Sequence, residues 1–230
     1  MEESGRPSRG QSQAAYTDID GTVTAYNTIF EFLRFDAAKR SCEAEAEDLL
    51  AGLRSAARNG APRSVTNARY FCWWRGRSVA EIDELGERWA DAQAESPEEW
   101  PFLEPVTSLL DAHTRSGRRI VAVTVSFEPA LVRVRRRWPN LEMLCTLPRT
   151  HKGRYTGDIE EALVGGAKER AVASHAAEYA VDLSASFAYG DHHSDLQFMA
   201  LAGESLLVIP TVKDGPAPNG LRFATQFSRP

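Results

Sequence analysis

The chain has few of the features that mark disulfide-stabilised, membrane-spanning or nucleic-acid-binding proteins. It holds three cysteines in 230 residues, without a CxxC pair or the spacing of zinc ligands, so we expect reduced thiols and a cytoplasmic protein. No stretch approaches the ~20 consecutive apolar residues of a membrane span. Because 27 Lys and Arg stand against 32 Asp and Glu, we expect neither nucleic acid nor a membrane as a partner.

The first residues also lack the apolar segment of a signal peptide. Residues 1–13 are rich in Ser, Gly and charge, which predicts a flexible tail. The rest of the chain, with 43% hydrophobic residues overall, is long enough for one domain with a large insertion or for two small domains. The sequence does not indicate an oligomeric state.

After a short strand, the first half of the chain has a helical pattern. Residues 14–18, AAYTD, predict a buried strand. The expected helices that follow are 28–38, 42–60, 65–74 and 78–95, the last one beginning with a capping box of Ser78 and Glu81. We therefore expect an all-helical insert, a cap, over residues 26–104.

From residue 104 onward, helices alternate with short apolar strands. The expected helices are 104–117, 127–138, 167–180 and 194–203, the expected strands are 119–126, 141–147, 185–191 and 205–210, and a hairpin is expected over 149–159. This alternation predicts an α/β fold with a doubly wound, mainly parallel sheet and ligands at the carboxyl ends of its strands. The predicted core comprises residues 14–25 and 105–230.

Two aspartates stand one residue apart directly after the first expected strand, in YTDIDGTVT (16–24). At about 4 Å, two such charges repel by roughly 4 kcal/mol at the effective dielectric of a protein surface. A polar turn or a helix N-cap would explain the pair but would also tolerate Asn or Ser. A divalent metal would explain both aspartates, since side chains at i and i+2 of a strand point to the same face.

Four signals follow one another in a characteristic order: DIDGT (18–22), VAVTVS (121–126), Lys168 in GGAKERAV, and YGDHHSD (189–195). In this order the chain resembles the haloacid dehalogenase superfamily, and more narrowly its phosphoserine-phosphatase-like branch, in which a helical cap follows the first motif. The stretch CTLPRTHKGRYTGDI, followed by Gly166 and Lys168, is also similar to that branch. The resemblance covers nearly the whole chain beyond the tail and implies a Rossmann-like core.

The resemblance implies a Mg²⁺-dependent phosphatase that forms an aspartyl-phosphate on Asp18. Asp20 would protonate the leaving oxygen and then deprotonate the attacking water. Lys168 would offset the charge of the phosphoryl group. Asp191 and Asp195, with the Asp18 carboxylate and the Asp20 carbonyl, would complete an oxygen site for Mg²⁺.

Smaller residues would hold the phosphate and the loops around it. Thr124 stands at a strand end, where its hydroxyl and nearby N–H groups would face an anion, although packing of a β-branched strand residue is a rival explanation. Ser126 would bind phosphate or cap the next helix. Gly21 would allow a tight turn, and Thr22 would hold the loop by hydrogen bonding.

One position at the entrance to the cap departs from the branch that the chain resembles. Phosphoserine phosphatases place a glutamate nine residues after the nucleophile, where it meets the substrate's ammonium group, and this chain has Asn27. We therefore expect phosphoserine not to be the preferred substrate. The aromatic stretch 69–77 predicts a helical core, with Arg69, Arg75 or Arg77 open as contacts to an anionic substrate.

The letters DHH at 191–193 also mark a manganese phosphoesterase family. That family would need a Gly-rich histidine motif near its C-terminus, and residues 200–230 contain no histidine. We therefore interpret Asp191 as the metal ligand and His192 and His193 as rim residues. The remaining histidines show no ligand spacing and are expected at the surface: His113, His151 and His175.

These residues favour a phosphatase that acts on a small phosphomonoester. A phosphotransferase that hands the phosphoryl group to an alcohol, and a catalytically inactive phosphate-binding or regulatory module, remain as alternatives. A dehalogenase would not need the second acid, Asp20. The alternative interpretation of Lys168 is a solvated lysine on a helix surface. Lys152 would then be the nearby lysine that takes its role.

Overall fold

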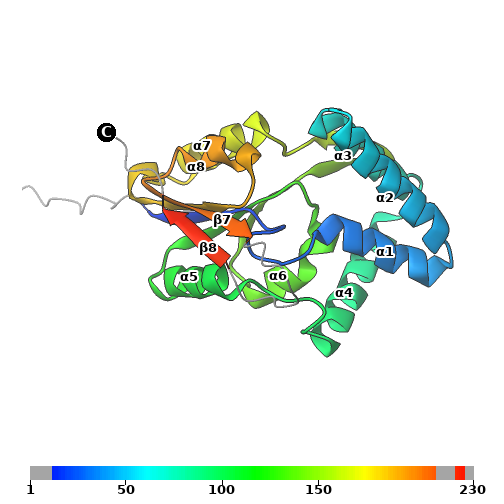
Figure 1. Cartoon of the computed structure of the whole chain (residues 1–230), viewed down its shortest axis with the longest axis horizontal. Coiled ribbons are helices and arrows are strands. Elements are labelled where there is room, and N and C mark those ends of the chain that lie inside the picture. The colour runs from blue at the N-terminus through cyan, green and yellow to red at the C-terminus, as the bar shows by residue number, and fades with distance from the viewer. Residues whose placement is uncertain (1–11, 211–220, 226–230) are drawn as a thin grey trace, which may run out of the picture.

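The structure, a computed structural model, describes residues 12–210 and 221–225. At its centre lies a six-stranded sheet of order β3-β2-β1-β6-β7-β8 (Figure 1). The strands are β1 (Ala14–Thr17), β2 (Arg119–Val123), β3 (Glu142–Leu144), β6 (Phe187–Gly190), β7 (Glu204–Pro210) and β8 (Leu221–Thr225). All neighbouring pairs are parallel except β7 and β8, so the predicted doubly wound α/β fold is confirmed.

Helices cover both faces of this sheet (Figure 1). They are α5 (Glu104–Arg115) and α6 (Val132–Arg137) on one face, and α7 (Gly166–Glu178) and α8 (Leu196–Met199) on the other. Strand β1 is buried on both sides, because Ala15 packs in the cluster with α5 and α6 while Tyr16 packs in the cluster with α7. Such burial on two faces explains the continuous apolar character of the central strands.

The strand order reverses at the centre of the sheet. From β1 the chain crosses to β2 and then β3, and it later returns on the other side of β1 with β6. In open α/β sheets the carboxyl ends of the two strands at such a reversal flank a binding crevice. Asp18 follows β1 and Asp191 follows β6, and the Asp18 N–H donates to the Tyr189 carbonyl at 2.9 Å.

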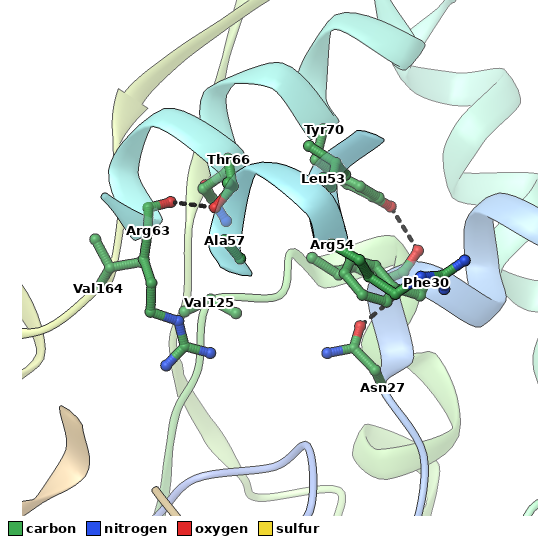
Figure 2. A pocket seen from close by; sticks show the side chains of 12 residues that line it. Asn27, Phe30, Leu53, Arg54, Ala57, Arg63, Thr66, Tyr70, Val125 and Val164 are labelled. Carbon is green, nitrogen blue, oxygen red and sulfur yellow. Dashed lines mark hydrogen bonds between the residues drawn. The ribbon is translucent and has the colours of Figure 1, made fainter. Parts of the chain in front are cut away.

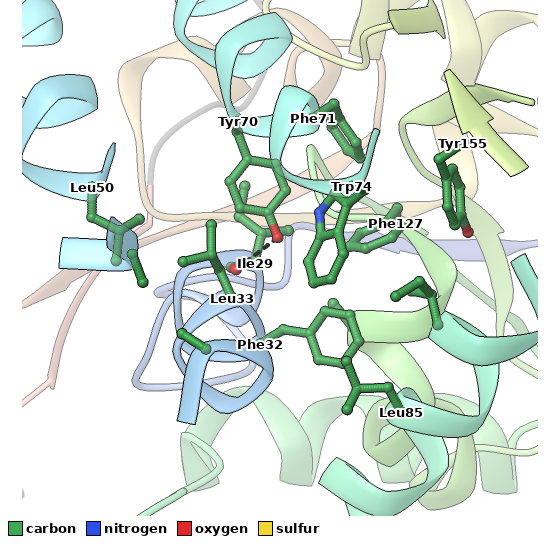
Figure 3. Close-up of a cluster of buried hydrophobic side chains, with 14 of the residues drawn as sticks. Ile29, Phe32, Leu33, Leu50, Tyr70, Phe71, Trp74, Leu85, Phe127 and Tyr155 are labelled. Carbon is green, nitrogen blue, oxygen red and sulfur yellow. Dashed lines mark hydrogen bonds between the residues drawn. The ribbon is translucent and has the colours of Figure 1, made fainter. Parts of the chain in front are cut away.

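Four helices lie between β1 and α5, in the order that the sequence predicts. They are α1 (Thr28–Arg40), α2 (Glu43–Arg58), α3 (Arg63–Phe71) and α4 (Val79–Glu95). The capping box predicted for α4 does not form completely: Ser78 makes no side-chain capping bond, and the carboxylate of Glu81 also pairs with Arg77 at 2.6 Å. The aromatic residues of the insert pack against one another in its interior (Figure 3).

Two segments from beyond the insert complete this aromatic cluster. Phe127, which lies in the loop after β2, is 1% exposed, and its ring centroid lies 5.7 Å from that of Trp74 (Figure 3). The hairpin of β4 (Leu147–His151) and β5 (Arg154–Glu161) contributes the buried ring of Tyr155. The hairpin itself was expected, but its position against the insert was not.

The ends of the described chain differ from the sequence prediction. Strand β8 was not expected, because an edge strand joins the sheet through its backbone and a five-residue segment shows no clear alternation. Residues 1–11 of the predicted tail lie outside the described residues, whereas the Gln13 carbonyl already accepts the N–H of Arg119 at 3.1 Å. No helix in the part of the chain that the structure describes is long and apolar enough to cross a bilayer.

Candidate active site

Lys168 connects two of the predicted acidic residues. Its Nζ donates to Asp18 Oδ1 and to Asp195 Oδ1, both at 2.7 Å, and the three residues are between 1% and 6% exposed. Burial disfavours the ammonium, but the two carboxylates together outweigh burial and raise the pKa of Lys168. The lysine lies in the first turn of α7, while the alternative, Lys152, is exposed in the hairpin turn.

Three carboxylates gather at this point. Asp18, Asp191 and Asp195 each place one oxygen within 4.8 Å of the others. With Lys168 as the neighbouring cation, the cluster keeps a net negative charge when all three are ionised. Burial raises the pKa of Asp18, against the opposing charge of Lys168, and burial together with Asp195 raises the pKa of Asp191.

The donors of this cluster suit a divalent cation. Carboxylate oxygens are the ligands that Mg²⁺ prefers, and a bound cation would balance the excess negative charge. Among the described residues the cluster includes no histidine, so its chemistry differs from that of the DHH motif.

Gly21 allows the loop after β1 to approach the cluster. Its φ is +87°, and a Cβ at this position would lie 2.4 Å from Asp191 Oδ2. A larger residue would strain the backbone and displace the carboxylate. The neighbouring Thr22 hydroxyl donates to Asp191 Oδ1 at 3.5 Å, so the loop contacts the cluster through both residues.

Asp20 has one free oxygen. Its Oδ1 accepts the N–H of Thr28 at the start of α1, at 2.8 Å, whereas Oδ2 is buried and has no partner among the described residues. Burial, followed by the charge of Asp18, raises the pKa of Asp20 to about 7. A carboxyl group with such a pKa can both donate and accept a proton near neutral pH.

Thr124 and Ser126 are fully buried in the loop after β2. The Thr124 hydroxyl accepts the N–H of Ser126 at 3.1 Å, and the Thr28 hydroxyl donates to the Ser126 hydroxyl at 2.9 Å. Ser126 does not cap the following helix, whose N-cap position is Phe127. Within the described chain, the Thr124 hydroxyl bonds to the Ser126 backbone and the Ser126 hydroxyl bonds to Thr28 of α1, and neither bonds to Asp18.

A cavity of about 200 Å³ lies between the insert and the loops that carry the predicted residues (Figure 2). Val125, which lies between Thr124 and Ser126, and Val164, which precedes the start of α7, line it from below the insert. Asn27 also lines it, next to Thr28, the partner of Asp20. The cavity therefore borders the segments that hold the acidic cluster.

The arginines at this cavity differ from those that the sequence suggested. Arg54 and Arg63 line it, whereas Arg69, Arg75 and Arg77 do not. One feature of the sequence could have indicated the cavity lining from α3. Arg63, Asn67 and Tyr70 are spaced four and three residues apart, so they share one face of the helix.

Arg63 also connects α3 to the loop after β6. Its Nη1 donates to Ser194 Oγ at 2.9 Å and lies 3.3 Å from His192 Nδ1. The N–H of His192 in turn donates to Asp195 Oδ2 at 3.2 Å. Burial, followed by the charge of Arg63, lowers the pKa of His192. His192 therefore lies between the acidic cluster and the insert.

Comparisons of the sequence with known proteins agree with this geometry. The sequence model of haloacid dehalogenase-like hydrolases matches residues 15–200. Phosphoserine phosphatase SerB1 of Mycobacterium tuberculosis (strain ATCC 25618 / H37Rv) is 25% identical over 208 residues, which cover 87% of this chain and 66% of that protein. The chain thus spans slightly less than two thirds of the length of this relative.

Solved structures show the same fold at lower identity. A protein of unknown function from Bordetella pertussis Tohama I superposes with a TM-score of 0.72 at 17% identity, covering 84% of this chain and 89% of that one. A substrate-bound phosphoserine phosphatase superposes with a TM-score of 0.59 at 16% identity, covering 86% of each chain.

Proposed function

The chain belongs to the haloacid dehalogenase-like hydrolase family, and from this premise we propose that it is a Mg²⁺-dependent phosphatase acting on a small phosphomonoester through an aspartyl-phosphate. The observation that carries the proposal is the pair of unlike aspartates after β1. Asp18 is bonded to Lys168, while Asp20 has a free buried oxygen and its other oxygen bonded to the N–H of Thr28. One aspartate suits attack on phosphorus and the other suits proton transfer.

In the proposed reaction, Asp18 attacks phosphorus and the P–O bond of the ester breaks. Asp20 gives its proton to the departing alkoxide, which leaves as a neutral alcohol. Asp20 then takes a proton from the water that attacks the aspartyl-phosphate, and inorganic phosphate leaves. Lys168 offsets negative charge throughout, which is the main task of a protein in phosphoryl transfer.

The carboxylates of Asp18, Asp191 and Asp195 would hold Mg²⁺. Bound there, Mg²⁺ would neutralise charge on the transferring phosphoryl group. Thr22 and Gly21 would keep Asp191 in place, and the loop of Thr124 and Ser126 would border the phosphate.

We assign residues 26–104 as a cap over a core of 14–25 and 105–230. The two connections between them run side by side, since the Ala25 N–H donates to Pro101 and the Leu103 N–H donates to Val23, at 3.1 and 2.9 Å. A paired connection of this kind suits a cap that closes on the substrate and excludes water. The cavity between cap and core would hold the alcohol part of the ester.

Hydrolysis of p-nitrophenyl phosphate by the purified chain tests this function. We expect turnover with Mg²⁺, none in chelator, and none in Asp18→Asn, which removes the attacking charge and keeps the shape. Asp20→Asn should lower kcat by about 10² to 10⁴, the contribution of a general acid. Asp158→Asn, at an exposed hairpin position, is the matched control and should turn over like the wild type.

Two results would contradict the proposal. Wild-type turnover in Asp18→Asn would exclude the covalent route, and a wild type that hydrolyses no ester with Mg²⁺ would indicate an inactive phosphate-binding module. Formation of a phosphorylated alcohol in the presence of glycerol would instead identify a phosphotransferase.

A further inference from the structure

Asn67 is a buried polar side chain in the cavity that borders the segments holding the acidic cluster. It is 7% exposed, lies on the buried face of α3 and lines the cavity. Its Oδ1 is enclosed and accepts no hydrogen bond from any residue that the structure describes. Buried amide oxygens without a donor are rare in folded proteins, and a ligand is one way to supply the donor. Rotation of the amide exchanges its two ends, so Asn67 can present a donor or an acceptor.

Each of the other neutral polar side chains of the cavity wall makes a hydrogen bond within the described chain (Figure 2). The Tyr70 hydroxyl donates to the carbonyl of Ile29 at 2.8 Å, and the Thr66 hydroxyl donates to that of Arg63 at 3.1 Å. Asn27 Oδ1 accepts the N–H of Phe30 at 3.1 Å. Among these neutral side chains, Asn67 is therefore the one whose buried acceptor, Oδ1, has no donor within the described chain.

The charges around the cavity oppose a cationic ligand. The described lining includes two guanidinium groups, of Arg54 and Arg63, and no carboxylate. An ammonium group placed there would lack a counter-charge. Apolar side chains such as Ile29, Leu53 and Val125 make up much of the remaining wall, and they suit the C–H faces of a carbon chain.

We propose that Asn67 is a specificity-determining residue that accepts a hydrogen bond from a hydroxyl group of the substrate's alcohol, so that the enzyme prefers phosphate esters of small polyols. The proposal rests on the phosphatase function proposed above. A hydroxyl supplies the donor that Oδ1 lacks and carries no charge that the arginines would repel. The cavity volume of about 200 Å³ is below the ~300 Å³ of pockets for drug-sized ligands, which suits an alcohol of a few carbons.

The test compares two series of esters with equal chain lengths. The first contains glycerol, erythritol and ribitol phosphates, and the second contains n-propyl, n-butyl and n-pentyl phosphates. We expect the wild type to have a kcat/KM for the best polyol ester at least about tenfold above that for its alkyl counterpart. In Asn67→Leu this ratio should fall toward one. Asn59→Leu, at the exposed end of α2, is the matched control and should keep the wild-type ratio.

A second variant guards against a folding defect in the first. Asn67→Asp keeps the shape but adds a carboxylate, so its kcat/KM for 3-aminopropyl phosphate should rise relative to n-propyl phosphate. Thermal unfolding of each variant checks the fold. Equal wild-type rates for the two series, or a polyol preference that survives Asn67→Leu, would overturn the proposal.

Turnover of p-nitrophenyl phosphate separates this proposal from the proposed function. If the wild type hydrolyses it but does not favour polyol esters, the function stands and the assignment of Asn67 fails. If no ester is hydrolysed, the proposed phosphatase function is rejected. Calorimetric titration with ribitol phosphate in the presence of Mg²⁺ then tests whether Asn67 contributes to binding. Binding at least about tenfold weaker in Asn67→Leu would support the assignment, and equal binding would exclude it.

Discussion

At the scale of single residues, the amide of Asn27 both caps a helix and lines the cavity. Its Oδ1 accepts the N–H of Phe30 and so caps the first turn of α1. The rest of the amide faces the open space of the cavity (Figure 2). Because the amide is neutral and its oxygen already accepts one hydrogen bond from the helix, Asn27 offers an ammonium group no hydrogen bond to an opposite charge. This geometry gives a physical reason to expect that phosphoserine is not the preferred substrate.

Asn27→Asp should change that preference without loss of the cap, since Asp and Asn cap helices about equally well. The added carboxylate would face the ammonium of phosphoserine, and a charge-assisted hydrogen bond is worth roughly 1.5 to 3 kcal/mol. We expect kcat/KM for phosphoserine, divided by that for glycerol phosphate, to rise about ten- to hundredfold. Asn27→Ser, which caps without a charge, should leave the ratio low. A wild type that already prefers phosphoserine would contradict this interpretation.

At the scale of elements, two buried histidines fasten helices to the sheet. His113 on α5 lies 2.6 Å from the Tyr189 hydroxyl of β6, and His175 on α7 lies 3.0 Å from the Tyr16 hydroxyl of β1. The prediction that both lie at the surface was wrong, since each is 5% exposed. Their partners are 76 and 159 residues away, so no local pattern could indicate that a phenol would satisfy the ring.

The stability of the α5 contact should depend on pH through His113. Burial, followed by the charge of Arg118, lowers the pKa of His113 from 6.5 to about 4. Between these values the unfolded chain binds a proton at His113 that the folded chain does not bind. The free energy of unfolding should therefore fall as the pH drops through this range, by at most about 3 kcal/mol from this group.

Urea denaturation at about pH 7 and about pH 4.5 measures this effect. His113→Gln keeps a hydrogen-bonding side chain but cannot titrate there, so its loss of stability on acidification should be smaller than that of the wild type. His151→Gln, at an exposed position of β4, should lose as much as the wild type. Equal losses in His113→Gln and the wild type would exclude His113 as the source.

At the scale of elements, the sequence predicts some residues of the candidate site and not others. The acidic residues were found because strand ends of an α/β sheet meet at one edge, which brings Asp18, Asp191 and Asp195 together. Arg63 and Asn67 were missed because their role depends on how α3 packs against loops distant in sequence. The helix pattern shows which residues share a face but not what that face meets.

At the scale of the whole molecule, Phe127 connects the sheet to the insert. Its backbone belongs to the loop after β2, while its ring contacts the cluster that includes Phe71 and Trp74, with centroids 5.3 and 5.7 Å away. The hairpin adds a second connection, since the Gly76 N–H donates to the Tyr155 carbonyl at 2.7 Å. Insert and sheet should therefore unfold together.

Phe127→Ala should weaken this coupling. Loss of a buried phenylalanine costs about 3 to 5 kcal/mol, so we expect an earlier denaturation midpoint than in the wild type. Four of the five tryptophans lie between residues 73 and 100, and their fluorescence reports mainly on the insert. Fluorescence and far-UV circular dichroism should give coincident transitions in the wild type and separate ones in Phe127→Ala.

Phe127→Leu keeps most of the apolar volume. Its denaturation midpoint should be close to that of the wild type, and its fluorescence and circular dichroism transitions should still coincide. Separate transitions already present in the wild type would show that insert and sheet are energetically independent.

The hairpin and Phe127 also bear on how such a chain could acquire a new specificity. Genetic recombination at the two ends of residues 26–104 would deliver the helices of a related protein but leave Phe127 and Tyr155 behind. The arriving helices would meet two aromatic rings shaped for a different interior, and the hybrid would start with a mismatched core. Substitutions within the cavity wall, at positions such as Asn27 and Asn67, avoid that conflict. For this architecture, single codon changes are therefore a more accessible evolutionary route to new substrates than the exchange of a whole gene segment.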